Sequence, residues 1–388
     1  MKKSWLIALT IFMGANITGD AKAIDKHDQL KNTITRWAEE QNFNGVLVVG
    51  IEGEPAITVT RGVADFSTKR PFTRNTIFQT GSVDKYLTAI AVLAMQDKGL
   101  LDIHTPITRY LPDYRSDTGD KVTLHHMLIN RSGLPNDYMP PVGKIPAALK
   151  ANPGATMHSL GFMDMSPEEG VKAYGSGDLK FTPGEQFDYS NTNWILLQHI
   201  LRTVSGKSYG EVLQEYVFSP AGMENSGTFE IDLNGATPKT VDIAIGYNPR
   251  GKRHDGDYPF PSFVGHGSYM AAADSIKLID ALYSGKLLTA TTLKEFSTVY
   301  SAEKHYAYGG RVYSSSEMDN QYQTTEPLFA KIAERFSPQN GSNGATKIAF
   351  IHPIGTPYTV AAFSNTPTYT GNVYRFAAEI ILNLQNKE

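Results

Sequence analysis

Apolar side chains recur every three or four positions over residues 27–42, and this spacing predicts an amphipathic helix. Two apolar runs rich in β-branched residues follow at 45–51 and 56–63. The Gly- and Pro-containing turn at 52–55 between them predicts a β-hairpin.

The C-terminal part of the chain shows the same elements in the opposite order. Residues 346–352 and 358–364 have the pattern of two strands around a turn, and residues 372–385 carry one apolar face at helical spacing. A helix and a hairpin at each end indicate that both ends share one antiparallel sheet flanked by helices.

The long middle of the chain is mostly helical in pattern, so we expect it to be inserted into the sheet domain. The predicted fold is α/β of the α+β kind, with a sheet subdomain at about 24–80 and 300–388 and a helical subdomain at about 83–300. Residues 136–180 are rich in Pro, Gly and Met, which favours only short regular structure. They could be a surface excursion or a soft, Met-lined cover over a binding site.

Residues 1–23 have the features of a secretory leader. Lys2 and Lys3 precede an apolar run at 5–13, and Ala21-Lys22-Ala23 places small residues at the positions that define cleavage. The apolar run is far shorter than the ~20 residues that span a bilayer. We therefore expect a bacterial signal peptide, no stable membrane anchor after cleavage, and a periplasmic or secreted mature protein.

Composition and charge exclude several classes of function. The 388 residues include 36 basic and 39 acidic side chains, and a net charge of −3 disfavours nucleic acid as a partner. The chain has no cysteine, which removes disulfides, thiolate nucleophiles and thiolate metal sites. Its ten histidines show no metal-binding spacing, and it has neither a nucleotide-binding glycine motif nor a Gly-x-Ser-x-Gly elbow. We expect no cofactor and no metal.

Ser82 and Lys85 form a Ser-x-x-Lys pattern, in which the two side chains share one helix face and the amine can take the proton of the hydroxyl. Residues 86–95 are apolar nearly all round, which predicts a buried helix behind the pair. Ser82 lies at its N-terminus, where the helix dipole favours developing negative charge. In isolation Ser82 could equally be an N-cap. The pattern recurs at Ser301–Lys304 without a buried helix behind it.

Tyr189 and Asn191 supply a second candidate group, just before another apolar helical pattern. A tyrosine at such a place usually packs. Beside a Ser/Lys pair, its hydroxyl can instead relay a proton to the leaving group, while the Asn amide orients substrate.

At these positions the chain resembles the serine β-lactamase and penicillin-binding-protein-like hydrolases, in particular the branch of class C β-lactamases, D-stereospecific peptidases such as D-aminopeptidases, and esterases. Residues 77–102 resemble the family's nucleophile helix, 106–135 its next segment, and 181–226 its Tyr-x-Asn region. The resemblance covers most of 24–388 and implies a β-lactamase/transpeptidase-like fold.

The resemblance also implies acyl transfer. Ser82 would attack a carbonyl, Lys85 and Tyr189 would both transfer protons, and water would hydrolyse the acyl-enzyme. The oxyanion would lie between the backbone N–H of Ser82 and one from the strand that carries the family's third motif.

That third motif differs here. The family has Lys or His, any residue, then Gly on a strand near the C-terminus, and its cation helps to hold a substrate carboxylate. The matching residues are Gln339-Asn340-Gly341, with a one-residue shift to Pro338 as the alternative, so the cation is missing. The implied substrate-binding residues are Asn191, Gln339, Asn340 and Gly341. A neutral Gln339 can hydrogen-bond but contributes no charge attraction.

Three further residues qualify the resemblance. Asn130 stands where the family commonly has His, and Asp84 is an unusual acid inside the Ser-x-x-Lys pattern, where it could simply favour the helix N-terminus. His266-Gly267-Ser268 imitates the third motif, but a helical segment at 271–283 follows it instead of the terminal strand pair.

We therefore expect an exported serine hydrolase whose site lies between the sheet and the helical insertion, at the N-terminus of the 82–98 helix. Its substrate would be a small molecule or peptide-like compound, and the missing cation favours an ester, or an amide lacking a critical carboxylate. Two alternatives stay open: a catalytically impaired binding protein, suggested by Gln339 and Asp84, and a true class C-like β-lactamase.

Overall fold

The computed structural model describes residues 17–135, 171, 175–228, 242–248, 267–343, 345–367 and 372–386. Most of the 136–180 segment lies outside the described residues, so both interpretations of it stay open. His266 also lies outside them.

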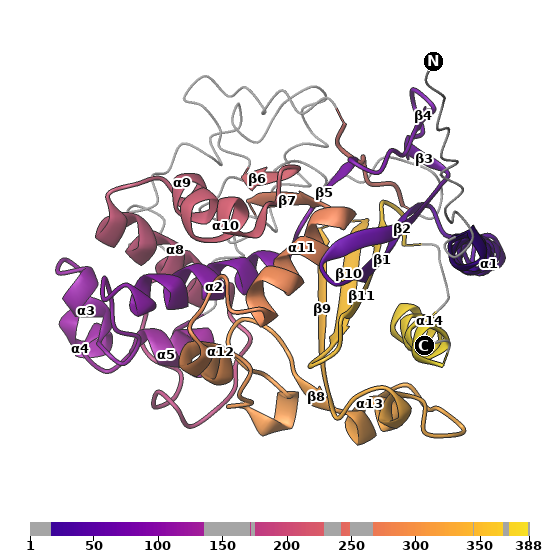
Figure 1. Ribbon diagram of the computed structural model, residues 1–388. Helices are drawn as coiled ribbons and strands as arrows, with labels where there is room; N and C mark the ends of the chain where they lie inside the picture. Colours follow the sequence, from indigo (N-terminus) through magenta and orange to yellow (C-terminus); the bar gives the residue numbers. More distant parts are fainter. Residues whose placement is uncertain are drawn as a thin grey trace, which may run out of the picture.

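A six-stranded antiparallel sheet lies at the centre of the fold, in the order β2-β1-β11-β10-β9-β8 (Figure 1). Its strands are β1 (Gly45–Ile51), β2 (Glu54–Arg61), β8 (Tyr313–Ser314), β9 (Arg335–Asn343), β10 (Thr346–Pro353) and β11 (Tyr358–Ser364). β1 pairs with β11 in a register that sets Val48 opposite Ala361. The predicted sharing of one sheet by the two ends of the chain is thus confirmed.

The helices from the two ends of the chain cover one face of this sheet. They are α1 (Ile17–Glu40) and α14 (Val373–Gln385), and α13 (Ser315–Gln321) lies near them (Figure 1). Trp37 of α1 stacks on Phe376 of α14 with ring centres 4.2 Å apart. α1 begins at Ile17, before the expected start at residue 27 and inside the predicted leader, whose cleavage stays a prediction.

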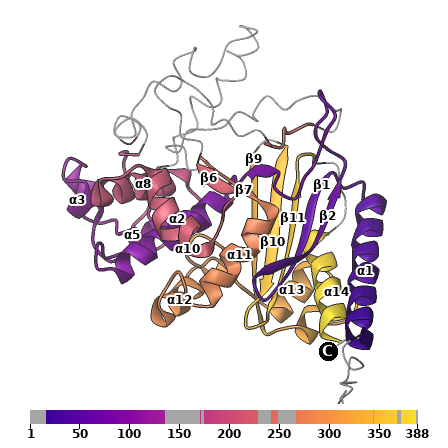
Figure 2. The same cartoon turned by 45° about the horizontal axis from the view of Figure 1, so that its top comes forward.

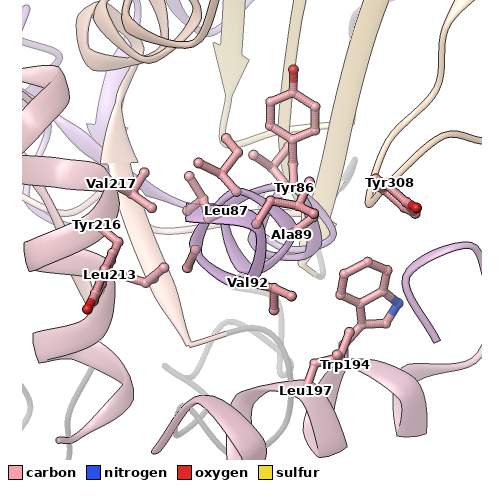
Figure 3. Packing of buried hydrophobic residues seen from close by; sticks show 14 of the residues in the cluster. Tyr86, Leu87, Ala89, Val92, Trp194, Leu197, Leu213, Tyr216, Val217 and Tyr308 are labelled. Atoms are coloured by element: carbon pink, nitrogen blue, oxygen red, sulfur yellow. The ribbon is translucent and has the colours of Figure 1, made fainter. Parts of the chain in front are cut away.

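The other face of the sheet carries the helical layer that positions the candidate site (Figure 2). Its main helices are α2 (Val83–Asp97), α8 (Asn191–Ser205), α9 (Tyr209–Leu213), the π-helical turn η1 (Gln214–Phe218), α11 (Ala272–Tyr283) and α12 (Ala290–Phe296). Every residue of α2 from Val83 to Met95 is buried. Figure 3 shows why: α8, with Trp194 and Leu197, and the α9–η1 segment, with Leu213 and Val217, surround it. The predicted buried central helix is confirmed.

A second, three-stranded sheet in the order β5-β7-β6 lies within this helical layer. Its strands are β5 (Ile77–Gln79), β6 (Ser226–Thr228) and β7 (Ser268–Ala271), while β3 (Val63–Asp65) and β4 (Arg70–Pro71) form a separate pair. The short helices are α3 (Ile107–Tyr110), α4 (Ser116–Gly119), α5 (Leu124–Leu128), α10 (Ser219–Ala221), η3 (Ala302–Lys304) and η4 (Phe329–Lys331).

Helix α11 packs directly on the central sheet: a Cβ placed on Gly50 of β1 would lie 2.2 Å from the Ile276 side chain. α11 therefore lies between the sheet and the helical layer, and the expected bounds of the helical subdomain, about 83–300, stay a prediction. None of the helices in the described ranges combines the length and apolarity needed to cross a bilayer.

Candidate active site

Ser82 occupies the N-cap position of α2, and its side chain is half-buried. The hydroxyl makes no capping hydrogen bond, so the alternative of a side-chain cap does not describe its role. The amide of Lys85 donates to the Ser82 carbonyl over 3.2 Å, which places the two residues one helical turn apart. The expected shared face of Ser82 and Lys85 follows from this turn.

Two glycines allow β9 to approach the start of α2. A Cβ on Gly341 would lie 2.0 Å from the Thr80 carbonyl oxygen and 3.1 Å from the Ser82 nitrogen. A Cβ on Gly81, whose φ is +52°, would lie 2.7 Å from the Ser342 nitrogen. Strand and helix N-terminus are therefore in backbone contact, and the amides of Ser82 and Ser342 both lie at this junction.

Lys85 is almost completely buried, with 1% of its surface exposed. Within the described part of the chain, its Nζ has no hydrogen-bond partner. The same Nζ lies 5.2 Å from the centre of the Tyr189 ring. The fold thus brings Tyr189, more than 100 positions away in the sequence, to the buried amine of the Ser82–Lys85 turn.

Asn130 holds the Tyr189 segment in place. Its φ of 55° is left-handed, a conformation that Asn tolerates well. Its carbonyl accepts from the Asp188 amide at 2.9 Å, and its Oδ1 accepts from the Ser190 amide at 3.3 Å and from Asn193 Nδ2 at 3.0 Å. The residue that departs from the family pattern therefore fixes the backbone on both sides of Tyr189.

Tyr189 itself is 36% exposed and lies at the surface of the site. Asn191, two positions later, is the first residue of α8 and is half-buried. The Tyr-x-Asn pattern thus spans the entry into α8, close to the N-terminus of α2.

The three residues matched to the third motif have different surroundings. Gly341 pairs with Ile348 and Gln339 with Phe350, both in the core beneath α2, whereas Asn340 pairs with Ala349 on the face of α1 and α14. Of these three, Gly341 is the one that the structure brings against Ser82, which fits the alignment without the shift to Pro338. Asn340 is exposed and leaves β9 on the opposite face.

The Gln339 side chain is engaged within the protein. Its Nε2 donates to the Arg311 carbonyl and to Ser337 Oγ, each over 3.1 Å. The amide therefore holds the loop before β8, and it carries no charge.

Asp84 is completely buried in the first turn of α2. Its carboxylate accepts hydrogen bonds from Ser268 Oγ, from Gln198 Nε2 at 2.8 Å and from Tyr209 Oη at 3.3 Å. Burial raises the pKa of Asp84 to about 6, although the Ser268 hydrogen bond and the Lys85 charge oppose this rise. Asp84 thus ties α2 to β7, α8 and α9, a larger role than the expected preference for a helix N-terminus.

Sequence reasoning missed two residues here: Tyr306, which contacts Tyr189, and Arg311, which contacts Tyr306. The buried Tyr306 meets the Tyr189 ring edge-on, with ring centres 6.2 Å apart, and the Arg311 guanidinium lies 5.7 Å from the centre of the Tyr306 ring. Their only signal in the sequence is a run of tyrosines and glycines that ends in arginine, YAYGGR at 306–311.

The second Ser-x-x-Lys copy is structural. Ser301 is buried, and its Oγ accepts from Arg131 Nε at 2.8 Å and donates to the Ile129 carbonyl at 3.3 Å. Lys304 is exposed. Among the described residues, no group of three or more His, Asp or Glu side chains could hold a metal ion.

Several known proteins are similar to this chain in sequence. Penicillin-binding protein 4* of Bacillus subtilis is 29% identical over 254 residues, which are 65% of this chain and 52% of that protein. The chain thus spans about half the length of that curated relative. Esterase EstB of Burkholderia gladioli is 26% identical over 279 residues, covering 66% of this chain and 70% of the esterase.

Among solved structures, D-amino acid amidase from Ochrobactrum anthropi SV3, crystallised with D-phenylalanine, superposes with a TM-score of 0.68. The match covers 94% of this chain and 100% of the amidase at 18% identity, so it shows a shared fold. The model of the family described as Beta-lactamase matches residues 30–377, nearly the whole chain. With its Ser-x-x-Lys helix, its Tyr-x-Asn turn and this match, the chain belongs to the beta-lactamase family.

Proposed function

We propose that this protein is an exported serine hydrolase that forms an acyl-enzyme on Ser82 and cleaves an ester or amide bond. The observation that carries the proposal is the buried Lys85 amine, which lies one helical turn from Ser82 and against the ring of Tyr189. A serine hydroxyl becomes a nucleophile when a neighbouring base takes its proton, and this amine is placed to do so.

The reaction proceeds in two steps. Ser82 Oγ bonds to the substrate carbonyl carbon while its proton passes to Lys85. The bond to the leaving oxygen or nitrogen then breaks, and Tyr189 donates its proton to that atom. Lys85 reprotonates Tyr189. In the second step a water molecule attacks the acyl carbon and gives a proton to the Lys85–Tyr189 pair. The bond to Ser82 Oγ then breaks, and Oγ takes a proton back.

The negative charge on the carbonyl oxygen needs hydrogen-bond donors during both steps. The backbone amides of Ser82 and Ser342 lie at the junction of α2 and β9, where the two glycines remove any side chain between them. Donors fixed in such a position stabilise an oxyanion without reorganisation, and the N-terminus of α2 adds its positive dipole end.

The comparisons support a serine hydrolase, because the matched family is named for an enzyme that hydrolyses an amide bond and one of the relatives is an esterase. The substrate class of this chain is a proposal. Export rests on the features of residues 1–23 and is tested by N-terminal sequencing of the protein recovered from the cell exterior or periplasm. Retention of Met1 there would contradict cleavage.

Covalent labelling tests the nucleophile. A fluorophosphonate probe should label the wild-type protein, and Ser82→Ala should abolish the label. Ser301→Ala, which disrupts the second Ser-x-x-Lys copy, is the matched control and should label like the wild type. Equal labelling of wild type and Ser82→Ala would refute the assignment.

A panel of substrates separates the proposal from its alternatives. Short-chain esters and D-amino-acid amides should turn over in a Ser82-dependent way. Binding of these compounds without any turnover would favour an impaired binding protein, and fast hydrolysis of a chromogenic cephalosporin would favour a true β-lactamase.

A further inference from the structure

We propose that Arg311 binds a carboxylate on the leaving-group side of the substrate. The inference rests on the proposed function, because it takes Ser82, Lys85 and Tyr189 as the reaction centre.

Three successive contacts lead from the reaction centre to Arg311. The Lys85 amine lies 5.2 Å from the centre of the Tyr189 ring, and the Tyr189 ring meets Tyr306 with 6.2 Å between ring centres. The Arg311 guanidinium then lies 5.7 Å from the centre of the Tyr306 ring, within the range of a cation–π contact. Only one aromatic ring therefore separates the guanidinium from Tyr189.

The backbone of Arg311 is fixed by the strand that lies against Ser82. Gln339 of β9 donates its Nε2 to the Arg311 carbonyl over 3.1 Å. The neighbouring Gly310 leaves room for this amide, since a Cβ there would lie 2.4 Å from Gln339 Oε1. Gln339, the neutral residue at the third-motif position, thus holds the loop that carries the cationic side chain of Arg311.

The charge of Arg311 is available for a ligand. Its side chain is half-buried, and among the described residues no carboxylate pairs with it. Glu317, on the same stretch of chain, is already occupied: it accepts from the Ser314 amide at 2.7 Å and pairs with His305 Nδ1 at 3.2 Å. By contrast, Arg131 near the same site has an acidic partner in Glu303.

A partly buried arginine that lacks a counter-ion among the described residues suits a carboxylate because its planar guanidinium can make two parallel hydrogen bonds to the two oxygens. The contact with Tyr306 orients the guanidinium plane before any ligand arrives. Tyr189 protonates the leaving group in the proposed mechanism, so we assign the carboxylate that a cation next to the Tyr189–Tyr306 pair would bind to the leaving group and not to the acyl chain.

A pair of esters that differ only in charge tests the inference. 3-Carboxyphenyl butyrate and 3-carbamoylphenyl butyrate share the acyl group and the shape of the leaving group. Arg311→Gln should lower kcat/KM for the carboxylate ester by roughly 10- to 100-fold, the effect of losing a charge-assisted hydrogen bond. The carbamoyl ester should stay within about twofold of wild type, which also shows that the variant is folded.

Two further variants sharpen the comparison. Arg311→Lys keeps the charge without the bidentate geometry and should restore part of the loss. Lys304→Gln removes an exposed cation from the same stretch of chain and should leave both esters unaffected. Equal losses for the two esters in Arg311→Gln, or no loss for either, would overturn the inference.

Binding to the Ser82→Ala variant separates this inference from the proposed function. With turnover blocked, calorimetry should show tighter binding of the carboxylate ester than of the carbamoyl ester, and Arg311→Gln should remove the difference. If wild type shows no Ser82-dependent labelling and no turnover of the substrate panel but this difference in binding is present, the proposed function fails and carboxylate binding by Arg311 stands. If both esters bind alike, the inference fails whatever the turnover.

Discussion

Replacing Asp84 by Asn should remove one contribution that makes the wild-type protein less stable as the pH rises. Burial raises the pKa of this carboxyl from 3.8 to about 6 in the folded protein. Between these values the native state keeps a proton that the unfolded chain gives up, so the free energy of unfolding falls as the pH rises. At 1.36 kcal/mol per pKa unit, the full loss is about 3 kcal/mol.

Urea unfolding measures this effect when it is followed by the fluorescence of the buried Trp194. From about pH 4 to about pH 7, the free energy of unfolding of Asp84→Asn should rise relative to wild type by an amount approaching 3 kcal/mol. Asp113→Asn, at an exposed aspartate, is the control for losing one carboxyl group. A difference between Asp84→Asn and wild type that is constant with pH, or that falls, would refute the reasoning.

Three further predictions concern the site and the sheet. Tyr189→Phe keeps the ring but loses the hydroxyl, so kcat should fall by roughly 10²–10⁴-fold, and more for alkyl than for p-nitrophenyl esters; equal losses would contradict a proton relay to the leaving group. Gly341→Ala would put a Cβ 2.0 Å from the Thr80 carbonyl oxygen. The resulting displacement of β9 should lower kcat on the order of 10²-fold. An unchanged kcat would contradict the close approach of β9 to the N-terminus of α2. Burial lowers the pKa of His352 from 6.5 to about 4. As the pH falls through this interval, the free energy of unfolding of wild type in urea should therefore fall by about 3 kcal/mol relative to His352→Gln, the opposite sign to the Asp84 effect. A difference that is constant with pH would exclude this cause.

The sequence predicts best the parts of the fold whose pattern is local. The expected strand at 358–364 is β11 to the residue, and the expected helix at 372–385 differs from α14 by one residue. The buried helix behind Ser82 follows from its unbroken apolar composition. Contacts that depend on tertiary packing, such as those of α11 with the central sheet, are not written in any local pattern.

The polar partners of the site could not be predicted for the same reason. Asp84 meets Ser268, Gln198 and Tyr209, which come from three distant segments of the chain. Arg311 contacts Tyr306 through its guanidinium and Gln339 through its carbonyl, and nothing in their spacing indicates this. Side chains that meet only through the folding of distant segments leave no periodic trace in a single sequence.

The pairing of β1 with β11 has a consequence for how the molecule folds. The two strands come from opposite ends of the chain, and the nearby Asn44 and Asn365, joined by a hydrogen bond, are 321 positions apart. Contacts of such high sequence separation slow folding, because chain entropy is lost before the contact can form. The central sheet cannot form completely until the last strands have been synthesised. Until then, the edge of β1 that pairs with β11 has no partner. A chain of this topology remains incompletely folded throughout its synthesis, the state in which a secretory leader would need to deliver it.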